Sequence, residues 1–167
     1  KICEILKKNN IDYYETGIEH GTVTALIESY KFEITSLRED ISTDGRHAKV
    51  QFSKNWKDDA SRRDFTINSI YSDNEGNLFD PFNGKKDLEN GLINFIGDTE
   101  ARVKEDYLRI LRYLRFFANY SKQPHNLEVI RKLKINIGGV LKLSKERLLE
   151  ELKKIIEIES LEKITKD

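Results

Sequence analysis

The sequence RRDFTINS, at residues 62–69, is the stretch around which the rest of this chain is organised. It is a short polar cluster inside an apolar run, and the surrounding residues 58–71 are predicted to form a helix. On that helix Asp64 and Asn68 lie four residues apart and face the same way, where a carboxylate and an amide can grip the hydroxyl pair of a sugar. Arg63 beside them offers a planar fork of donors to a phosphate. The alternative is a helix whose charged residues form surface salt bridges.

A second charged stretch, EDYLRILR, follows at residues 105–112 and is predicted to lie within one long helix over 99–120. Glu105 precedes Arg109 by four residues, which is the favourable order for an ion pair. Asp106 accepts hydrogen bonds and Arg109 donates them, so the two together match the edge of a nucleobase. The arginines recur at every third position, namely Arg109, Arg112 and Arg115. The buried stripe expected beneath them consists of Leu108, Leu111, Leu114 and Phe117. The two stretches together predict a site for an anionic ligand, with a nucleotide as the leading candidate, and an ordinary solvated helix is the alternative.

Composition excludes several classes of protein. The chain has 167 residues, of which 38% are hydrophobic and 35% charged, as expected of one soluble domain or two small ones. Cys3 is the only cysteine, which excludes an internal disulfide and a cysteine zinc site and is compatible with a reducing cytoplasm. No apolar run is long enough to span a membrane, and the first residues lack the apolar core of a signal peptide. The sequence therefore predicts a cytoplasmic protein with no membrane partner.

The net charge of zero hides an asymmetry between the two parts of the chain. Residues 1–100 contain 13 basic and 19 acidic residues, whereas residues 101–167 contain 16 and 10. This pattern indicates a metal- or nucleotide-handling part joined to a part that binds a polyanion, or two halves that simply attract each other.

The predicted secondary structure changes character near residue 97. Before that point the prediction is a helix at 1–10, strands at 13–17, 21–27 and 31–37, a loop at 38–57, the helix at 58–71 with Asp58 or Asp59 as N-cap, a strand at 78–79, a helix at 85–90 and a strand at 92–96. Beyond it, helices are predicted at 99–120, 126–137 and 144–158. The fold class is therefore α+β, with a small mixed or antiparallel sheet in residues 1–97 and an all-helical part in residues 98–167. We expect the three strands at 13–37 to share one sheet, with the 62–68 helix packed nearby.

Segments in four places carry a resemblance to a known family. They are RRDFTINS at 62–69, DPFNGKKDL at 80–88, EDYLRILR at 105–112 and LSKER at 143–147. In the same order they resemble the motifs RRDxTINA, DPxxGxxDL, EDxxRxxR and LSxER of the class II tRNA nucleotidyltransferase and bacterial poly(A) polymerase family. Ser69 stands where that family has alanine, and Tyr107 where proline is common. The resemblance implies a partial, truncated nucleotidyltransferase head over residues 1–97 and a helical neck over 98–167 that selects the base and binds RNA.

The reaction that the resemblance implies joins nucleotides from CTP and ATP to the 3′ end of a tRNA, without a template and with release of pyrophosphate. By the same resemblance, Arg63 binds the triphosphate, Asp64 engages the ribose and Asn68 belongs to the same nucleotide-binding set. The residues that select the base are then Asp106, Arg109, Arg112 and Arg115, with Glu105 bracing Arg109.

The chain departs from the family at the metal site. The family binds Mg²⁺ with an Asp-x-Asp after a GGxVRD segment, and neither sequence occurs in this chain. Two-metal phosphoryl transfer needs such carboxylates, so Mg²⁺ is expected for the family while its ligands are missing here. Glu33, on a strand that corresponds to one flanking the family's active site, is a candidate supporting carboxylate. We expect a truncated product, the second half of a split gene or a decayed relative, inactive by itself, with a separate chain carrying the catalytic carboxylates as a candidate partner.

Other functions remain open at this point. Residues 38–49, which include DGRHA, resemble the flexible loop of the CCA-adding branch and favour CCA addition over the runner-up, poly(A) addition. A nucleotide- or RNA-binding module without catalysis is a second hypothesis, and a structural remnant that assembles only with a partner chain is a third.

Overall fold

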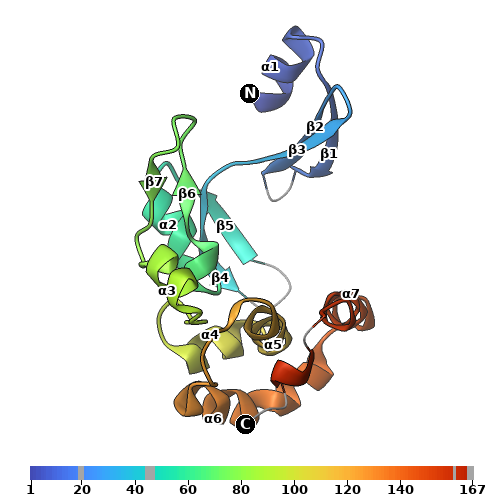
Figure 1. Cartoon of the computed structure of the whole chain (residues 1–167). Helices are drawn as coiled ribbons and strands as arrows, with labels where there is room; N and C mark the ends of the chain where they lie inside the picture. Colours follow the sequence, from blue (N-terminus) through green and yellow to red (C-terminus); the bar gives the residue numbers. More distant parts are fainter. Residues whose placement is uncertain (19–20, 44–47, 160, 165–167) are drawn as a thin grey trace.

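The computed structural model describes residues 1–18, 21–43, 48–159 and 161–164, and only the backbone of residues 40–43 and 48–50. The chain begins with helix α1 (Ile2–Lys8) and strands β1 (Asp12–Gly17), β2 (Thr22–Ile27) and β3 (Tyr30–Thr35). The three strands form one antiparallel sheet in the order β1-β2-β3, and α1 packs Leu6 against Val23 and Ala25. This sheet, predicted from the alternating pattern of its strands, lies at one end of the molecule (Figure 1).

Residues 38–57 do not form the loop that was predicted, because two segments within this range pair as strands. β4 (Arg38–Thr43) and β5 (Ala48–Phe52) form an antiparallel pair in which Arg38 faces Phe52. The alternating apolar positions of AKVQF, at residues 48–52, are typical of a strand. Residues 44–47, in the middle of the predicted loop, lie outside the described residues.

The RRDFTINS stretch is not helical throughout. Helix α2 (Trp56–Ser61) ends before it, and a 3-10 turn, η2 (Thr66–Asn68), follows it. Between them Phe65 is extended and forms an isolated bridge with Phe95, which is all that remains of the strand predicted at 92–96. Long-range bonds override the helical pattern here, since Ile96 N donates to the carbonyl oxygen of Asp64 at 3.0 Å and Thr66 N to that of Asn94 at 3.0 Å. The expected packing near the three-stranded sheet is also wrong, because α2 lies away from that sheet (Figure 1) and packs against β4.

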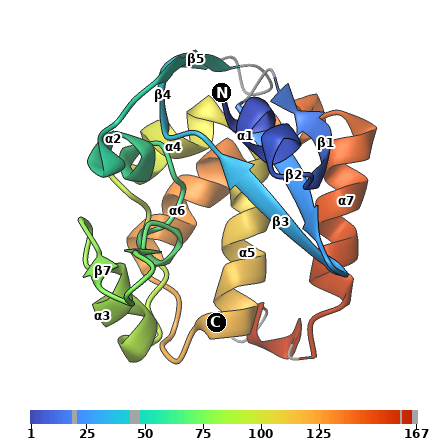
Figure 2. The ribbon, with the colours of Figure 1, turned by 90° about the horizontal axis from the view of Figure 1, so that it is seen from above.

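Short elements link this stretch to the helical part. The paired strands β6 (Tyr71–Ser72) and β7 (Leu78–Phe79) are followed by α3 (Gly84–Asn90), which ends at the left-handed Gly91. Helices α4 (Thr99–Glu105), α5 (Leu108–Tyr120), α6 (Leu127–Asn136) and α7 (Lys145–Ile156) follow, with the 3-10 turns η3 (Ile137–Lys142) and η4 (Leu161–Ile164). Seen from above, α5 lies in the middle of these helices, with α4 and α7 on either side (Figure 2). Within the described residues, no helix has the length and apolar character needed to cross a membrane.

The long helix predicted over 99–120 is two helices that meet at Asp106. Asp106 is extended (φ −153°, ψ 107°), and its Oδ1 accepts from the N–H of Leu108 at 3.1 Å. A short polar side chain that bonds to the backbone competes with helix continuation, which explains the break. Tyr107 then lies against Gly139, where a Cβ would come within 2.1 Å of the ring. The buried stripe is also different from the prediction, because Leu108, Leu111 and Leu114 are only half-buried.

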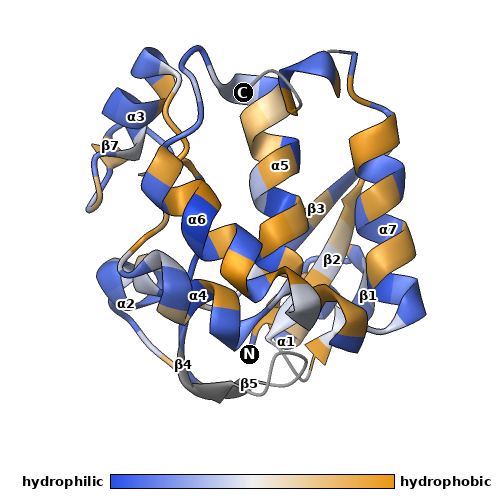
Figure 3. Cartoon of the chain, turned by 90° about the horizontal axis from the view of Figure 1, so that it is seen from below, coloured by the Kyte–Doolittle hydropathy of each residue, from blue (hydrophilic) through white to orange (hydrophobic). Residues whose placement is uncertain are grey.

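The main core joins residues from both sides of position 97. Its buried members are Phe65, Ile93, Phe95, Val103, Ile110, Tyr113, Phe116, Phe117, Val129 and Leu133. Phe95 stacks on Tyr113 with ring centroids 5.9 Å apart, and Phe65 lies 4.8 Å from Phe95. The helices around this core are amphipathic, with polar and apolar residues alternating along α5 and α7 (Figure 3). The RRDFTINS stretch is therefore anchored to α5 through Phe65, and the arginine side of α5 is left facing away from the core.

Candidate functional site

An open cavity of about 550 Å³ lies where the RRDFTINS stretch meets the helices. Its volume falls within the range of roughly 300–1,000 Å³ that is usual for small-molecule sites. It is lined by Arg62, Arg63, Asp64, Asn68, Asp106, Leu108, Arg109, Arg112, Arg115, Phe116 and Arg147. All of the residues predicted to bind a nucleotide are in this set. The structure thus brings together two stretches that are about forty residues apart in the sequence.

Asp59 holds the two arginines at one side of the cavity. This side chain is 2% exposed, and its Oδ1 accepts from Arg62 Nε at 2.9 Å and Nη2 at 2.7 Å. Its Oδ2 accepts from Arg63 Nη2 at 3.0 Å and from the hydroxyl of Tyr71 at 2.8 Å. The N–H of Arg38, at the start of β4, donates to Oδ1 at 3.2 Å. Burial works to raise the pKa of Asp59, but the hydrogen bonds from Tyr71 and the two arginines lower it to about 2.

Asp64 is bound from three directions at the centre of the cavity wall. Its Oδ1 accepts from the N–H of Phe65 at 2.9 Å and from Asn68 Nδ2 at 2.8 Å. Its Oδ2 accepts from Arg112 Nε at 2.5 Å, which joins the RRDFTINS stretch to α5. Burial tends to raise the pKa of this carboxyl, but the charge of Arg112 and the hydrogen bonds hold it below its ordinary value. Asp64 and Asn68 are in contact, but the helix predicted to carry them is absent, and an extended residue and a 3-10 turn bring them together.

Glu105 connects two arginines at the end of α4. Its Oε2 accepts from Arg102 Nη1 at 2.6 Å and from Arg109 Nη1 at 2.6 Å. Arg109 also donates from Nη1 to the carbonyl oxygen of Arg102 at 2.7 Å. The predicted contact between Glu105 and Arg109 is therefore present, and it spans the break between α4 and α5.

Helix α7 supplies partners for the other side of the cavity. Asp106 Oδ2 accepts from Arg147 Nη2 at 2.7 Å, and Arg115 Nε donates to Glu151 Oε1 at 2.5 Å. Glu151 is fully buried, and the Arg115 guanidinium also lies 4.6 Å from the ring centroid of Phe116. The prediction that Asp106 and Arg109 share one helix is wrong, yet both side chains line the same cavity.

The DPFNG segment supports the turn that carries the site. Asp80 caps α3 by accepting from the N–H of Gly84 at 2.8 Å and of Lys85 at 2.9 Å. Gly84 packs against the backbone of Thr66, where a Cβ would come within 2.1 Å of the carbonyl oxygen. Asp87, one turn further on, accepts from Thr66 Oγ1 at 2.6 Å. The segment is therefore a support for the RRDFTINS turn, and its residues do not line the cavity.

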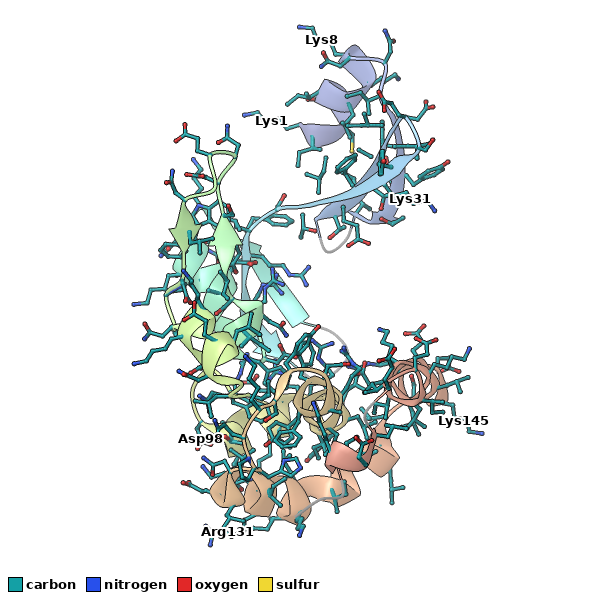
Figure 4. The ribbon with its side chains drawn as sticks, viewed as in Figure 1. Lys1, Lys8, Lys31, Asp98, Arg131 and Lys145 are labelled. Carbon is teal, nitrogen blue, oxygen red and sulfur yellow. The ribbon has the colours of Figure 1, made fainter. Side chains whose placement is uncertain are left out.

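Sequence reasoning missed several residues that hold the site together. Asp59 was predicted only as an N-cap, and Arg102, Arg147 and Glu151 were given no role at the site. Only Arg102 leaves a local signal, since it lies three residues before Glu105 on the same helix. Glu33 lies elsewhere, exposed on β3 and outside the cavity lining. Figure 4 shows Asp98, just before α4, and Lys145, at the start of α7, on opposite sides of α5.

The charge of the cavity suits an anion. Its lining has six arginines and two carboxylates, and each of these carboxylates is already paired with an arginine. Among the residues that the structure describes, no group of three or more His, Cys, Asp or Glu side chains could hold a metal ion. The described residues that line the cavity therefore do not fit Mg²⁺, whereas phosphate groups suit a set of guanidinium donors.

Comparison with known proteins identifies the family. Residues 1–94 match the family model of the poly(A) polymerase head domain. The chain is 48% identical over 142 residues to the mitochondrial CCA tRNA nucleotidyltransferase 1 of Homo sapiens, covering 84% of this chain and 33% of that protein. It is 38% identical over 159 residues to the CCA-adding enzyme of Lactobacillus johnsonii, covering 93% of this chain and 38% of that protein.

Solved structures agree with this assignment. The CCA-adding enzyme of Bacillus stearothermophilus in complex with CTP matches with a TM-score of 0.75 at 28% identity, covering 86% of this chain and 34% of that one. The chain thus spans about a third of the length of these relatives, between 33% and 38%. With its head-domain match extending over more than half of its residues, this chain belongs to the class II CCA-adding enzyme and poly(A) polymerase family.

Proposed function

We propose that this chain is the nucleotide-binding part of a template-independent RNA nucleotidyltransferase that adds C and A nucleotides to the 3′ ends of tRNA. The observation that carries the proposal is the convergence of the two predicted stretches on one arginine-rich cavity. The names of the relatives support CCA addition in particular, because they are CCA tRNA nucleotidyltransferases and CCA-adding enzymes. Its partners are then CTP, ATP and the tRNA end, in the cytoplasm or an organelle.

The phosphate side of the proposed site is formed by the arginines that Asp59 holds. Arg63 binds the triphosphate of the incoming nucleotide, with Arg62 beside it. Both guanidinium groups are fixed by the buried carboxylate before any ligand arrives, which reduces the ordering cost of binding. Phosphate carries no base identity, so this side binds all nucleoside triphosphates alike.

The sugar and base sides lie further along the same wall. Asp64 accepts from three protein donors, and a carboxylate has roughly four lone-pair sites, so it has room for a ribose hydroxyl with Asn68 beside it. Asp106 and Arg109 present an acceptor and donors to the base, and Glu105 fixes Arg109. Arg112 and Arg115 complete the wall and are each held by a carboxylate.

Catalysis needs residues beyond those of the cavity. The chain contains no Asp-x-Asp, and its described carboxylates do not form a metal site, so we propose that the carboxylates for Mg²⁺ come from another segment or from a separate chain. Poly(A) addition is the alternative activity, since both branches share the motifs. A nucleotide- or RNA-binding protein without catalysis is the alternative of another class.

The experiment that tests the proposal is nucleotide binding by the purified chain. Dissociation constants for CTP, ATP, UTP and GTP are measured by calorimetry at one ionic strength. We expect CTP and ATP to bind more tightly than UTP and GTP, and Arg109→Ala to remove that preference. Arg131→Ala is the matched control, because Arg131 is an exposed arginine on α6 at the opposite edge of the helical part (Figure 4). Equal affinity for all four nucleotides would overturn the base-selecting role.

A further inference from the structure

Arg102, on α4, bridges the two segments that supply the cavity with arginines. Its Nη2 donates to the carbonyl oxygen of Arg62 at 2.7 Å and also to that of Arg63. Its Nη1 donates at 2.6 Å to Glu105 Oε2, the same oxygen that accepts from Arg109 Nη1 at 2.6 Å. The Arg102 side chain is 13% exposed and does not line the cavity. A continuous chain of hydrogen bonds thus runs from the backbone of Arg63 to the guanidinium of Arg109.

Each end of this chain also has an anchor of its own. The Arg63 guanidinium is bound by Asp59 Oδ2 at 3.0 Å and lies 5.9 Å from the ring centroid of Tyr71. The Arg109 guanidinium is bound by Glu105 and by a carbonyl oxygen of α4. Each of the two guanidinium groups therefore has a hydrogen-bond partner besides the Arg102 side chain. What Arg102 fixes is the position of one segment relative to the other.

We propose that Arg102 is a positioning residue that couples triphosphate binding to base recognition. This inference rests on the proposed function, in which Arg63 binds phosphate and Arg109 reads the base. A ligand that binds two subsites gains affinity from the second subsite only when the distance between the subsites matches the length of the ligand. Arg102 touches no part of the nucleotide, but it sets that spacing, and a nucleoside triphosphate benefits from both subsites at once.

The test compares a ligand that needs both subsites with one that needs a single subsite. Dissociation constants for CTP and for inorganic tripolyphosphate are measured on the full chain and on Arg102→Lys, which keeps the charge but loses the planar fork. We expect CTP to bind about tenfold more weakly, a typical coupling between sites, while the affinity for tripolyphosphate changes less than about twofold. Lys104→Ala, which removes an exposed ion pair with Glu100 on the same helix, is the matched control and should leave both constants unchanged.

A double-variant cycle separates coupling from a general structural role. In an Arg109→Ala background, Arg102→Lys should cause no further loss of CTP affinity, because the base subsite is already gone. A parallel loss of CTP and tripolyphosphate binding, together with a lower melting temperature, would show that Arg102 only maintains the fold and would overturn the inference. Unchanged CTP affinity would overturn it as well.

The remaining outcomes distinguish the inference from the function on which it rests. If the unmodified chain bound CTP no more tightly than tripolyphosphate, the proposed base site would fail and the coupling with it. If Arg102→Lys does not fold, Arg102→Gln, which keeps an amide donor for the carbonyl oxygens, is measured in the same way. We again expect weaker binding of CTP with little change in the affinity for tripolyphosphate. Any other result would overturn the proposal.

Discussion

Replacing Asp59 with asparagine should destabilise the chain in a way that depends on pH. The pKa of Asp59 falls from 3.8 to about 2 in the folded chain, because its hydrogen bonds to Tyr71, Arg62 and Arg63 outweigh the opposing effect of burial. Each pKa unit corresponds to about 1.4 kcal/mol, so the depressed value contributes about 2 kcal/mol to the free energy of unfolding. The folded state binds fewer protons than the unfolded state. The contribution is therefore complete above about pH 5 and is lost as the pH falls towards 2.

Urea unfolding of the parent chain and of Asp59→Asn, repeated between pH 7 and pH 2.5, measures this difference. We expect Asp59→Asn to be less stable by about 2 kcal/mol at pH 7, and the gap to narrow steadily on acidification. Asp58→Asn is the control. Asp58 accepts from Ser53 Oγ at 2.7 Å at a half-exposed position, and its loss should cost less than about 1 kcal/mol. A difference in the free energy of unfolding between the parent chain and Asp59→Asn that stays the same at every pH would refute the electrostatic argument.

Further predictions concern the nucleotide, the reaction and the turn. Arg109→Ala should weaken discrimination between nucleotides by about 1–3 kcal/mol, because hydrogen-bonding groups on the base edge lose their partner. Arg63→Ala should instead weaken the binding of all nucleoside triphosphates equally. Competition between CTP and ATP in a complete enzyme that carries each change separates the two effects. The purified chain alone should not incorporate CTP or ATP into tRNA lacking its CCA end, even with Mg²⁺. Robust incorporation would contradict this. If the chain is the second half of a split gene, a separately expressed segment with GGxVRD and Asp-x-Asp should restore activity. Gly84→Ala should lower the melting temperature strongly, because its Cβ would come within 2.1 Å of the Thr66 carbonyl oxygen, while Gly138→Ala, with open space around it, should not.

Local sequence patterns predicted most of the elements of this fold. The sheet of β1, β2 and β3 and the helices α1, α3, α6 and α7 were all expected from periodicity and capping residues. These elements have the signals that act over a few residues, such as alternating apolar positions, Ser144 as N-cap and Gly91 after α3. The α+β class followed from them.

The failures lie where distant partners override local preference. The 58–71 helix stops at Ser61 because the following backbone bonds to residues 94–96, about thirty positions away. The 99–120 helix breaks because the Asp106 side chain caps a new helix while Arg147, from α7, holds its other oxygen. No pattern confined to one helix contains these partners. The convergence of the two arginine-bearing stretches was expected from the chemistry of one extended nucleotide that must reach both, and no pattern within either stretch shows it.

The arrangement of carboxylates explains how so many arginines can share one cavity. Six guanidinium groups in a small space repel one another, but Asp59, Glu105 and Glu151 lie behind the wall and each binds at least one of them. These carboxylates offset the repulsion in the absence of a ligand and fix the guanidinium groups in place. In the core beneath, Phe65 and Phe95 pack against Tyr113 of α5 and so anchor the RRDFTINS stretch to that helix. A cavity prepared in this way can take up a polyanion without reorganising. Under the proposed function, we expect its selectivity to depend on Asp106 and Arg109, whose hydrogen bonds have defined directions.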